Sequence, residues 1–257
     1  MQINTELSGS LKAGQFWDAP PILYERMFYM RKSTPVQYGI RILIYIIGLF
    51  FMALGVAFSV NSNLGVSPVN SLPYVISVVS GIALGNCVTI VFCSYILLQI
   101  IILRREFNPI NLCQIIFSTI FGYFTNFTKS LLGNFTLPTY AGQLAMLAIS
   151  IVLVAIGVML YVEVDLVPMP MEGLSMTLAK KVNMSFPNMK IIVDCIVVAA
   201  GVAISFLFLH RLEGVREGTV ITAIVVGRLI ALLKKPLSPV VQRVCFGAES
   251  SSGSKAG

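Results

Sequence analysis

The sequence predicts an all-α fold: a polytopic membrane protein of about six transmembrane helices in two three-helix repeats, each repeat with a short Pro-led half-helix. Of the 257 residues, 56% are hydrophobic and 11% are charged, whereas a soluble domain has roughly 25% charged residues. The apolar residues fall into long runs, and the charges lie between them. With a mean hydropathy of +0.86, the chain has too few polar side chains to cover a water-facing surface, so lipid must face much of it.

Six apolar runs are long enough to span a membrane. A helix of about 20 residues, rising 1.5 Å per residue, crosses the roughly 30 Å hydrocarbon core, and backbone groups in hydrocarbon must bond within their own segment. The runs cover residues 40–60, 84–103, 110–128, 142–162, 188–209 and 218–233. Two Pro-led pieces, 68–79 and 170–179, are too short for a span and are expected to be re-entrant or interfacial.

Charge placement predicts that both termini are cytoplasmic. With six spans and a basic, amphipathic cytoplasmic arm at residues 1–38, most basic loop residues fall on the cytoplasmic side, as does the polar tail at 236–257. These basic residues are Arg104, Arg105, Lys180, Lys181, Lys234, Lys235 and Arg243. Eight spans would put the pair at 104–105 outside and are less favoured. The arm either lies on the bilayer surface or is an unstructured tail.

The two halves of the chain resemble each other at an offset of 102 residues. The tetrapeptide at 53–56 (ALGV) matches that at 155–158 (AIGV), and at the same offset Pro68 corresponds to Pro170. We therefore divide the chain into a first repeat, 39–130, and a second repeat, 142–235. Chance similarity between apolar segments is the alternative, which the coincident glycine and proline positions argue against.

Three spans per repeat is an odd number, so the second repeat is expected to be inverted relative to the first. Inverted repeats with broken helices are a recurring design in transporters. Pro68 and Pro170 are suited to the first turn of a helix because proline has no N–H to leave unpaired there. The open helix N-termini carry unpaired N–H groups and a partial positive charge. The two pieces are therefore either binding elements for a substrate or ion, or interfacial elbows that only turn the chain.

Ionisable residues within spans are rare and expensive, which makes two of them candidate coupling residues. Asp194 lies in the fifth run and Arg228 in the sixth, at similar depth if the two helices are antiparallel neighbours. We expect them to pair, and Lys190, one turn from Asp194, to share the carboxylate. The pair is either a structural salt bridge or part of a proton or ion relay.

A second candidate site is the pair of Pro turns. Glu163, Asp165 and Glu172 surround the second turn, and Asn61, Asn63 and Asn70 occupy the same places in the first repeat. Two facing copies would give one polar and one acidic lining, and the acidic lining would suit a cationic substrate or a coupling proton. The alternative is that these residues are only solvated loop charges.

Three segments in this order resemble the YczE/YyaS/YitT family of bacterial multi-spanning membrane proteins: 64–68 (LGVSP), 165–170 (DLVPMP) and 217–220 (EGTV). The resemblance covers about residues 36–233, and Val167 stands where the family pattern expects glycine. It implies a multi-pass protein of the bacterial plasma (inner) membrane and says little about a substrate.

Other functional classes find little support in the sequence. No catalytic triad, nucleophile elbow, Walker loop or metal-ligand spacing is present, so we expect no enzyme, cofactor or metal. The net charge of +7 lies in clusters between apolar runs, which argues against nucleic-acid binding. The leading hypothesis is a small-molecule or ion transporter that lies in the lipid bilayer, as a monomer or as a homo-oligomer. The alternative is a non-transporting scaffold or regulator that acts through a protein partner and its basic arm.

Overall fold

The computed structural model describes residues 35–246, and every regular element in that range is helical. The all-α class predicted from composition is therefore confirmed for this part of the chain. The helices are α2 (Pro35–Ser62), α3 (Pro68–Ser80), α4 (Leu84–Leu103), α5 (Cys113–Leu132), α6 (Tyr140–Glu163), α7 (Pro170–Val182), α8 (Phe186–Leu209) and α9 (Glu217–Phe246), with the 3-10 turns η2 (Arg104–Glu106) and η3 (Pro109–Leu112) between α4 and α5.

Four of the helical segments are long and apolar enough to cross a membrane, and they coincide with four of the six runs that predicted spans. They are Pro35–Ser62, Leu84–Glu106, Tyr140–Glu163 and Phe186–Leu209. α5 and α9 are not among the four. Their polarity is the reason: α5 carries Gln, Ser, Thr and Asn side chains along its length, and α9 includes Arg228 and two lysines.

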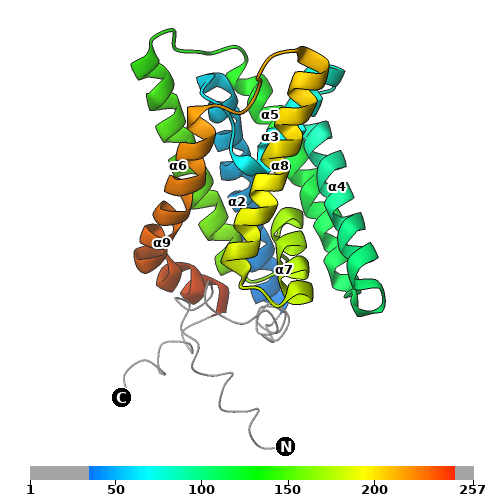
Figure 1. The fold of residues 1–257 in the computed structure, drawn as a ribbon. Helices are drawn as coiled ribbons and strands as arrows, with labels where there is room; N and C mark the ends of the chain where they lie inside the picture. Colours follow the sequence, from blue (N-terminus) through cyan, green and yellow to red (C-terminus); the bar gives the residue numbers. More distant parts are fainter. Residues whose placement is uncertain (1–34, 247–257) are drawn as a thin grey trace, which may run out of the picture.

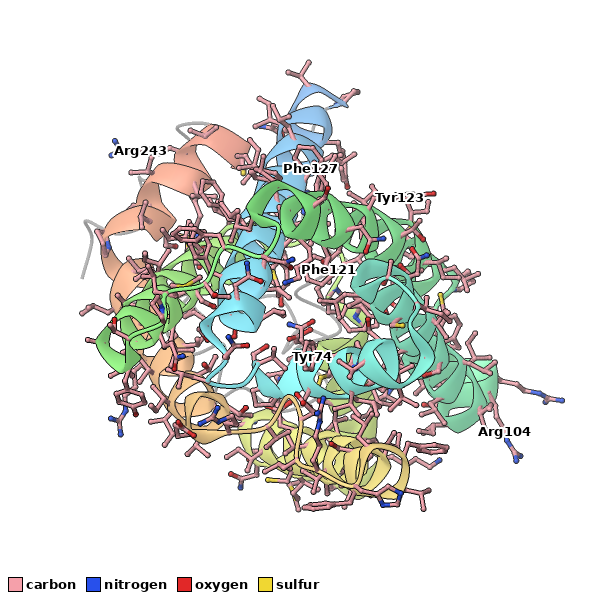
Figure 2. The ribbon with its side chains drawn as sticks, turned by 90° about the horizontal axis from the view of Figure 1, so that it is seen from above. Tyr74, Arg104, Phe121, Tyr123, Phe127 and Arg243 are labelled. Carbon is pink, nitrogen blue, oxygen red and sulfur yellow. The ribbon has the colours of Figure 1, made fainter. Side chains whose placement is uncertain are left out.

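α5 nevertheless has a buried face and an exposed apolar face. Phe121 and Thr125 are fully buried, whereas Tyr123 and Phe127 are 70% and 57% exposed. Figure 2 shows Phe121 turned toward the middle of the bundle and Tyr123 and Phe127 at its outside. Large apolar side chains on an outer face are typical of a surface that contacts lipid or a partner rather than water.

The antiparallel pair α2 and α6 forms the centre of the bundle. A Cβ atom added at Gly48 would lie 2.9 Å from the carbonyl oxygen of Gly157, and one at Gly157 would lie 2.5 Å from that of Gly48. Further along, a Cβ at Gly55 would lie 2.9 Å from the carbonyl oxygen of Ser150. The two backbones are therefore in direct contact, as small residues permit in membrane helix pairs.

The two Pro-led pieces form α3 and α7, which have 13 residues each. Proline occupies the first turn of both, and the preceding residues, Ser67 and Met169, have nearly the same backbone angles. Just after the helices that precede them, Asn63 and Asp165 have φ values of 57° and 52°. Asparagine and aspartate tolerate this left-handed conformation better than most residues do, which accounts for the sharp reversals.

Figure 1 places α3 toward one end of the bundle and α7 toward the other. α3 packs against α8 and α4, and α7 packs against α4 and α8. α9 packs instead against α6 and α2, on the side of the bundle away from α4. Each short helix therefore fills space between long helices that come from both halves of the chain.

The loop after α2 is bonded to the loop before α9. The Gly218 N–H donates to the Leu64 carbonyl at 2.8 Å, and the Val66 N–H donates to the Gly214 carbonyl at 2.9 Å. A Cβ at Gly65, where φ is +98°, would lie 2.6 Å from the Thr219 hydroxyl. Two of the sequence segments that carried the family resemblance, 64–68 and 217–220, therefore meet in space.

The helices extend beyond two of the predicted boundaries. α2 begins at Pro35, within the predicted arm, and α9 continues through Pro236 and Pro239 to Phe246, within the predicted tail. This last part of α9 packs against the bundle, because Ser238, Val241 and Cys245 are buried. The rest of the predicted arm, 1–34, and of the tail, 247–257, lies outside the described residues.

Candidate functional site

The second Pro turn is held by side chains from α2 and α4. The Tyr45 hydroxyl donates to the Val167 carbonyl at 3.0 Å, and Gln99 donates from Nε2 to the Pro170 carbonyl at 3.0 Å. Tyr45 and Gln99 are both fully buried. Buried tyrosine and glutamine need hydrogen-bond partners, and the opened backbone of the turn supplies them. The first turn of α7 is therefore fixed from two sides.

Glu172 lies in this first turn of α7. Its residue surface is half-buried, and its Oε2 atom is enclosed without a hydrogen-bond partner among the described residues. The groups that act on it electrostatically are Lys190 and Asp194 of α8 and the hydroxyl of Tyr161 of α6. A carboxylate oxygen that is shielded from water and has no donor is an unusual feature that calls for an explanation.

Burial has a direct consequence for the ionisation of Glu172. Desolvation raises the pKa of this carboxyl above its ordinary value, while the positive charge of Lys190 opposes that shift. Removal from water disfavours the charged form of an acid, which is the dominant effect here. Glu172 is therefore the acidic group at the second Pro turn that is suited to gain and lose a proton.

Of the two partners predicted for Asp194, Lys190 is found beside it and Arg228 is not. Lys190 Nζ lies 2.7 Å from Asp194 Oδ1, one helical turn away, as predicted. Arg228, by contrast, lies on an exposed part of α9, and α9 packs against α6 and α2 rather than against α8. The predicted Asp194–Arg228 pair is therefore wrong. It assumed that helices adjacent in sequence are neighbours in space.

Tyr95 of α4 brings a further polar group to the same region. The residue is 5% exposed, and its hydroxyl is another buried side-chain atom that lacks a hydrogen-bond partner in the described range. The charge of Asp194 acts on this hydroxyl across the bundle. Tyr95 lies one helical turn before Gln99, the residue of α4 that is bonded to the start of α7.

The first Pro turn has a neutral counterpart of this site. Asn70 is 4% exposed, and its Nδ2 donates to Ser67 Oγ at 3.0 Å. Its Oδ1 is the third buried atom without a partner in the part of the chain that the structure describes. A narrow crevice adjoins it, lined by Val56, Ser59, Val66, Ser67, Asn70, Ser150 and Val154. Asn70 and Glu172 therefore occupy equivalent positions in the two halves, and each has an enclosed side-chain oxygen without a hydrogen-bond partner in the described residues.

The other four members of the predicted amide and carboxylate set stabilise the fold instead. Asn61 donates to the carbonyls of Gly133 and Phe135 at 3.1 and 3.0 Å and accepts from Lys129. Its counterpart Glu163 accepts from Ser238 at 2.6 Å and from Gln242 at 3.1 Å.

Asn63 and Asp165 act mainly through their backbones. Arg216 donates to the Asn63 carbonyl at 3.0 Å, and Arg41 donates to the carbonyls of Val164 and Asp165. Of the expected amide and carboxylate lining, Asn70 and Glu172 therefore remain as the candidate binding residues.

The tyrosines near the second Pro turn were not identified as candidate site residues from the sequence. Tyr45, Tyr95 and Tyr161 lie inside apolar runs and look there like ordinary core residues. Gln99 was also missed, although it is the only amide in the second half of the run 84–103. A lone amide in an apolar run is the signal that identifies a buried hydrogen-bonding position in membrane segments.

Fold and site together define the class of this protein: between residues 35 and 246 it is all-α, with four helices that are long and apolar enough to span a membrane. The chain belongs to the Family of unknown function (DUF6198), whose model matches residues 39–235. No curated protein and no solved structure matches the chain. The likeness to the YczE/YyaS/YitT family stays a prediction, because the matching model carries a different name and no function.

Proposed function

We propose that the protein transports a small molecule or an ion through a site between two inverted repeats. One observation carries the proposal. Asn70 Oδ1 and Glu172 Oε2 are both enclosed without a hydrogen-bond partner in residues 35–246, and they lie 102 residues apart in the first turns of two Pro-led helices. Two unsatisfied polar atoms in equivalent places of two halves are what a binding element shared between inverted repeats requires.

The packing contacts support an inverted relation between the halves. Gly48 meets Gly157, and Gly55 meets Ser150; a shift of 102 residues converts one contact into the other. The same holds for two contacts of the short helices. A Cβ at Gly173 of α7 would meet Gln99, and a Cβ at Gly201 of α8 would meet the backbone at Ser71. In each pair of contacts, the two partners exchange places when the offset of 102 residues is applied. A two-fold axis that relates the two halves produces such an exchange.

We further propose that α5 and α9 complete six spans and that the α7 end is cytoplasmic. The ends of α4 and α7 carry Arg104, Arg105, Lys180 and Lys181, and Arg243 lies in the last turn of α9. At the other end, Arg211 and Arg216 are paired with Glu213 and Glu217. An excess of positive charge at one end is typical of the cytoplasmic side of a plasma-membrane protein. This topology, with both termini inside, agrees with a bacterial inner membrane.

Cysteine accessibility tests the proposal without knowledge of the substrate. Single cysteines at Ser67 and Met169, which precede α3 and α7, are introduced into a chain from which the five native cysteines have been removed. A transporter exposes its interior to each side in turn. We therefore expect a membrane-impermeant maleimide to label both positions in right-side-out vesicles and in inside-out vesicles.

Control positions establish the topology in the same vesicles. Ser80 and Val182 are exposed residues at the far ends of α3 and α7. Cysteines there should each react from one face only, and from opposite faces. If Ser80→Cys and Val182→Cys react from the same face, the inverted arrangement is wrong. If Ser67→Cys and Met169→Cys each react from a single face, the interior does not alternate and the transport proposal fails.

A further inference from the structure

We propose that the last part of α9, residues 236–246, lies along the membrane surface and binds anionic phospholipids through an apolar face and a basic residue. We name these residues the surface segment. The inference goes beyond the proposed function and takes from it only that α9 spans the membrane. It rests on three observations: the level at which the segment leaves the span, its two unlike faces, and its charge.

The surface segment begins where the spanning part of α9 ends. Ser238 donates to Glu163 Oε2 at 2.6 Å, and Glu163 is the last residue of α6, one of the four helices of spanning length and polarity. Residues 217–233 rise about 25 Å as a helix, which is close to the thickness of the hydrocarbon core. The surface segment is therefore level with the end of a span, at the boundary between hydrocarbon and water.

Two prolines lie inside α9 at this level. Pro236 and Pro239 each lack the N–H that an α-helix needs, and proline is the usual cause of a bend in a helix. Figure 1 shows the last part of α9, coloured red, bent toward the bundle at the end where α7 lies. A helix that bends where its span ends follows the membrane surface instead of extending into water.

The surface segment packs on the protein with one face and carries apolar side chains on the other. The first face consists of Ser238, Val241 and Cys245, which are buried at helical spacing. On the other face, Val240 and Val244 lie one turn apart and are 58% and 51% exposed. Apolar side chains on an exposed helix face indicate contact with lipid or with a partner rather than with water.

The charge of this region favours a lipid surface as the partner. Residues 218–246 contain four basic and no acidic residues, and Figure 2 shows Arg243, which is exposed, at the outside of the bundle. Anionic phospholipids of the cytoplasmic leaflet attract basic segments that follow a span. The apolar face also continues from the spanning part of α9, where Leu232 is exposed. Lipid that surrounds the span therefore reaches the surface segment as well.

Tryptophan fluorescence in reconstituted vesicles measures the depth of the surface segment. The full-length chain has one tryptophan, Trp17, which is replaced by phenylalanine so that Val244→Trp carries a single probe. The vesicles contain phosphatidylcholine and phosphatidylglycerol, brominated either near the head group or deep in the acyl chain. We expect stronger quenching by the shallow bromine, because an interfacial helix buries its apolar face only about 5–10 Å deep. Val240→Trp is a second probe and should give the same result.

Ile224→Trp is the matched control for depth. Ile224 is an exposed residue in the middle of the predicted span of α9. A tryptophan there should be quenched more strongly by the deep bromine than by the shallow one. The contrast between Ile224→Trp and Val244→Trp separates a surface segment from a helix that is uniformly immersed in lipid.

The preference for anionic lipid is measured with the Val244→Trp probe. Brominated phosphatidylglycerol should quench it more than an equal mole fraction of brominated phosphatidylcholine, and Arg243→Gln should reduce this excess about twofold. Arg211→Gln is the control for the change in net charge, because Arg211 lies at the other end of the bundle and pairs with Glu213. That variant should keep the excess.

Each outcome either supports the inference or overturns it. If neither brominated lipid quenches Val244→Trp and Val240→Trp, water or protein covers the face and the inference is wrong. It is also wrong if the deep bromine quenches them as strongly as it quenches Ile224→Trp, since the segment would then belong to the span. Equal quenching by the two lipid classes would overturn the binding of anionic lipid.

The result can be distinguished from a failure of the proposed function. If the deep bromine does not quench Ile224→Trp, α9 does not span the membrane, and the six-span topology and this inference fail together. One-sided labelling of the cysteines at Ser67 and Met169 would instead refute transport and leave the depth of the surface segment unchanged. Shallow quenching of Val244→Trp together with two-sided labelling supports both proposals.

Discussion

Gly48 and Gly157 place the backbones of α2 and α6 in direct contact, each glycine facing the carbonyl oxygen of the other. No side chain separates the two helices at this crossing. Lipid offers little hydrophobic drive for helix association, so close packing of this kind is a main source of stability in a membrane bundle. The contact lies about one turn from Tyr45, which bonds the Val167 carbonyl of the second Pro turn.

Gly157→Leu should destabilise the folded bundle strongly. A Cβ at this position would lie 2.5 Å from the Gly48 carbonyl oxygen and from Met52 Cγ, so α2 and α6 would have to separate. Overpacking typically costs about 1–3 kcal/mol, and more when backbone rather than a flexible side chain must move. Thermal unfolding in detergent and the yield of monodisperse protein on size-exclusion chromatography measure the effect.

Gly227→Leu is the matched control for that substitution. Gly227 lies in α9, and a Cβ there would meet no atom within 4 Å. The yield and midpoint temperature of this variant should stay near those of the wild type. Equal losses in both variants would show that the central crossing is not the origin of the effect.

Gly65→Ala should be more harmful than Gly81→Ala. Both glycines have a left-handed φ, +98° and +72°, so both substitutions carry a similar backbone penalty of roughly 1 kcal/mol. Only at Gly65 would the added methyl group also meet backbone and side-chain atoms, 2.7 Å from the Arg216 nitrogen. The difference between the two midpoint temperatures isolates the steric contribution of the loop contact, and no difference would contradict the close approach.

Ser238→Ala tests whether the end of α9 is an integral part of the bundle. Ser238 donates to Glu163 Oε2 at 2.6 Å, and both residues are buried. Loss of a donor to a buried carboxylate typically costs about 1–3 kcal/mol. Ser94→Ala, which removes a hydroxyl bonded only to its own helix, should have a much smaller effect on the unfolding midpoint. Equal midpoints in the two variants would mean that the extension of α9 contributes little to the fold.

Glu172 should make the stability of the protein depend on pH. Its pKa in the folded state is raised above the ordinary 4.5 by burial, so the unfolded chain ionises first as the pH increases. The folded state then binds more protons than the unfolded state, and the free energy of unfolding falls with rising pH. In N-methyl-D-glucamine buffers, the wild-type midpoint should decline relative to that of Glu172→Gln from about pH 4.5 upward. Parallel curves would contradict the buried carboxyl.

Hydropathy and proline placement predicted the helices well. An apolar run of about 20 residues has few structural options in lipid, and proline at the first turn of 68–79 and 170–179 marked where α3 and α7 begin. The offset of 102 residues also predicted equivalent backbone geometry, which the reversals at Asn63 and Asp165 show. These features depend on local sequence, and local sequence was sufficient.

Contacts between distant elements were harder to predict. The Asp194–Arg228 pair failed because sequence adjacency of α8 and α9 does not make them neighbours. The continuation of α9 past Pro236 and Pro239 was missed because proline usually ends a helix, whereas buried contacts of Ser238 and Val241 compensate here. The tyrosines around Glu172 gave no local signal, since an aromatic residue in an apolar run has the same appearance whether or not its hydroxyl faces a charge.

The two backbone hydrogen bonds that join the loop 63–67 to the loop 214–218 have a mechanical implication. They join the loop before α3 to the start of α9. A displacement of either helix therefore also moves the other as long as both hydrogen bonds persist. At the opposite end, Arg41 of α2 donates hydrogen bonds to the carbonyls of Val164 and Asp165, which follow α6. Any movement of α3 relative to α9, or of α2 relative to the end of α6, must therefore either preserve or break these hydrogen bonds.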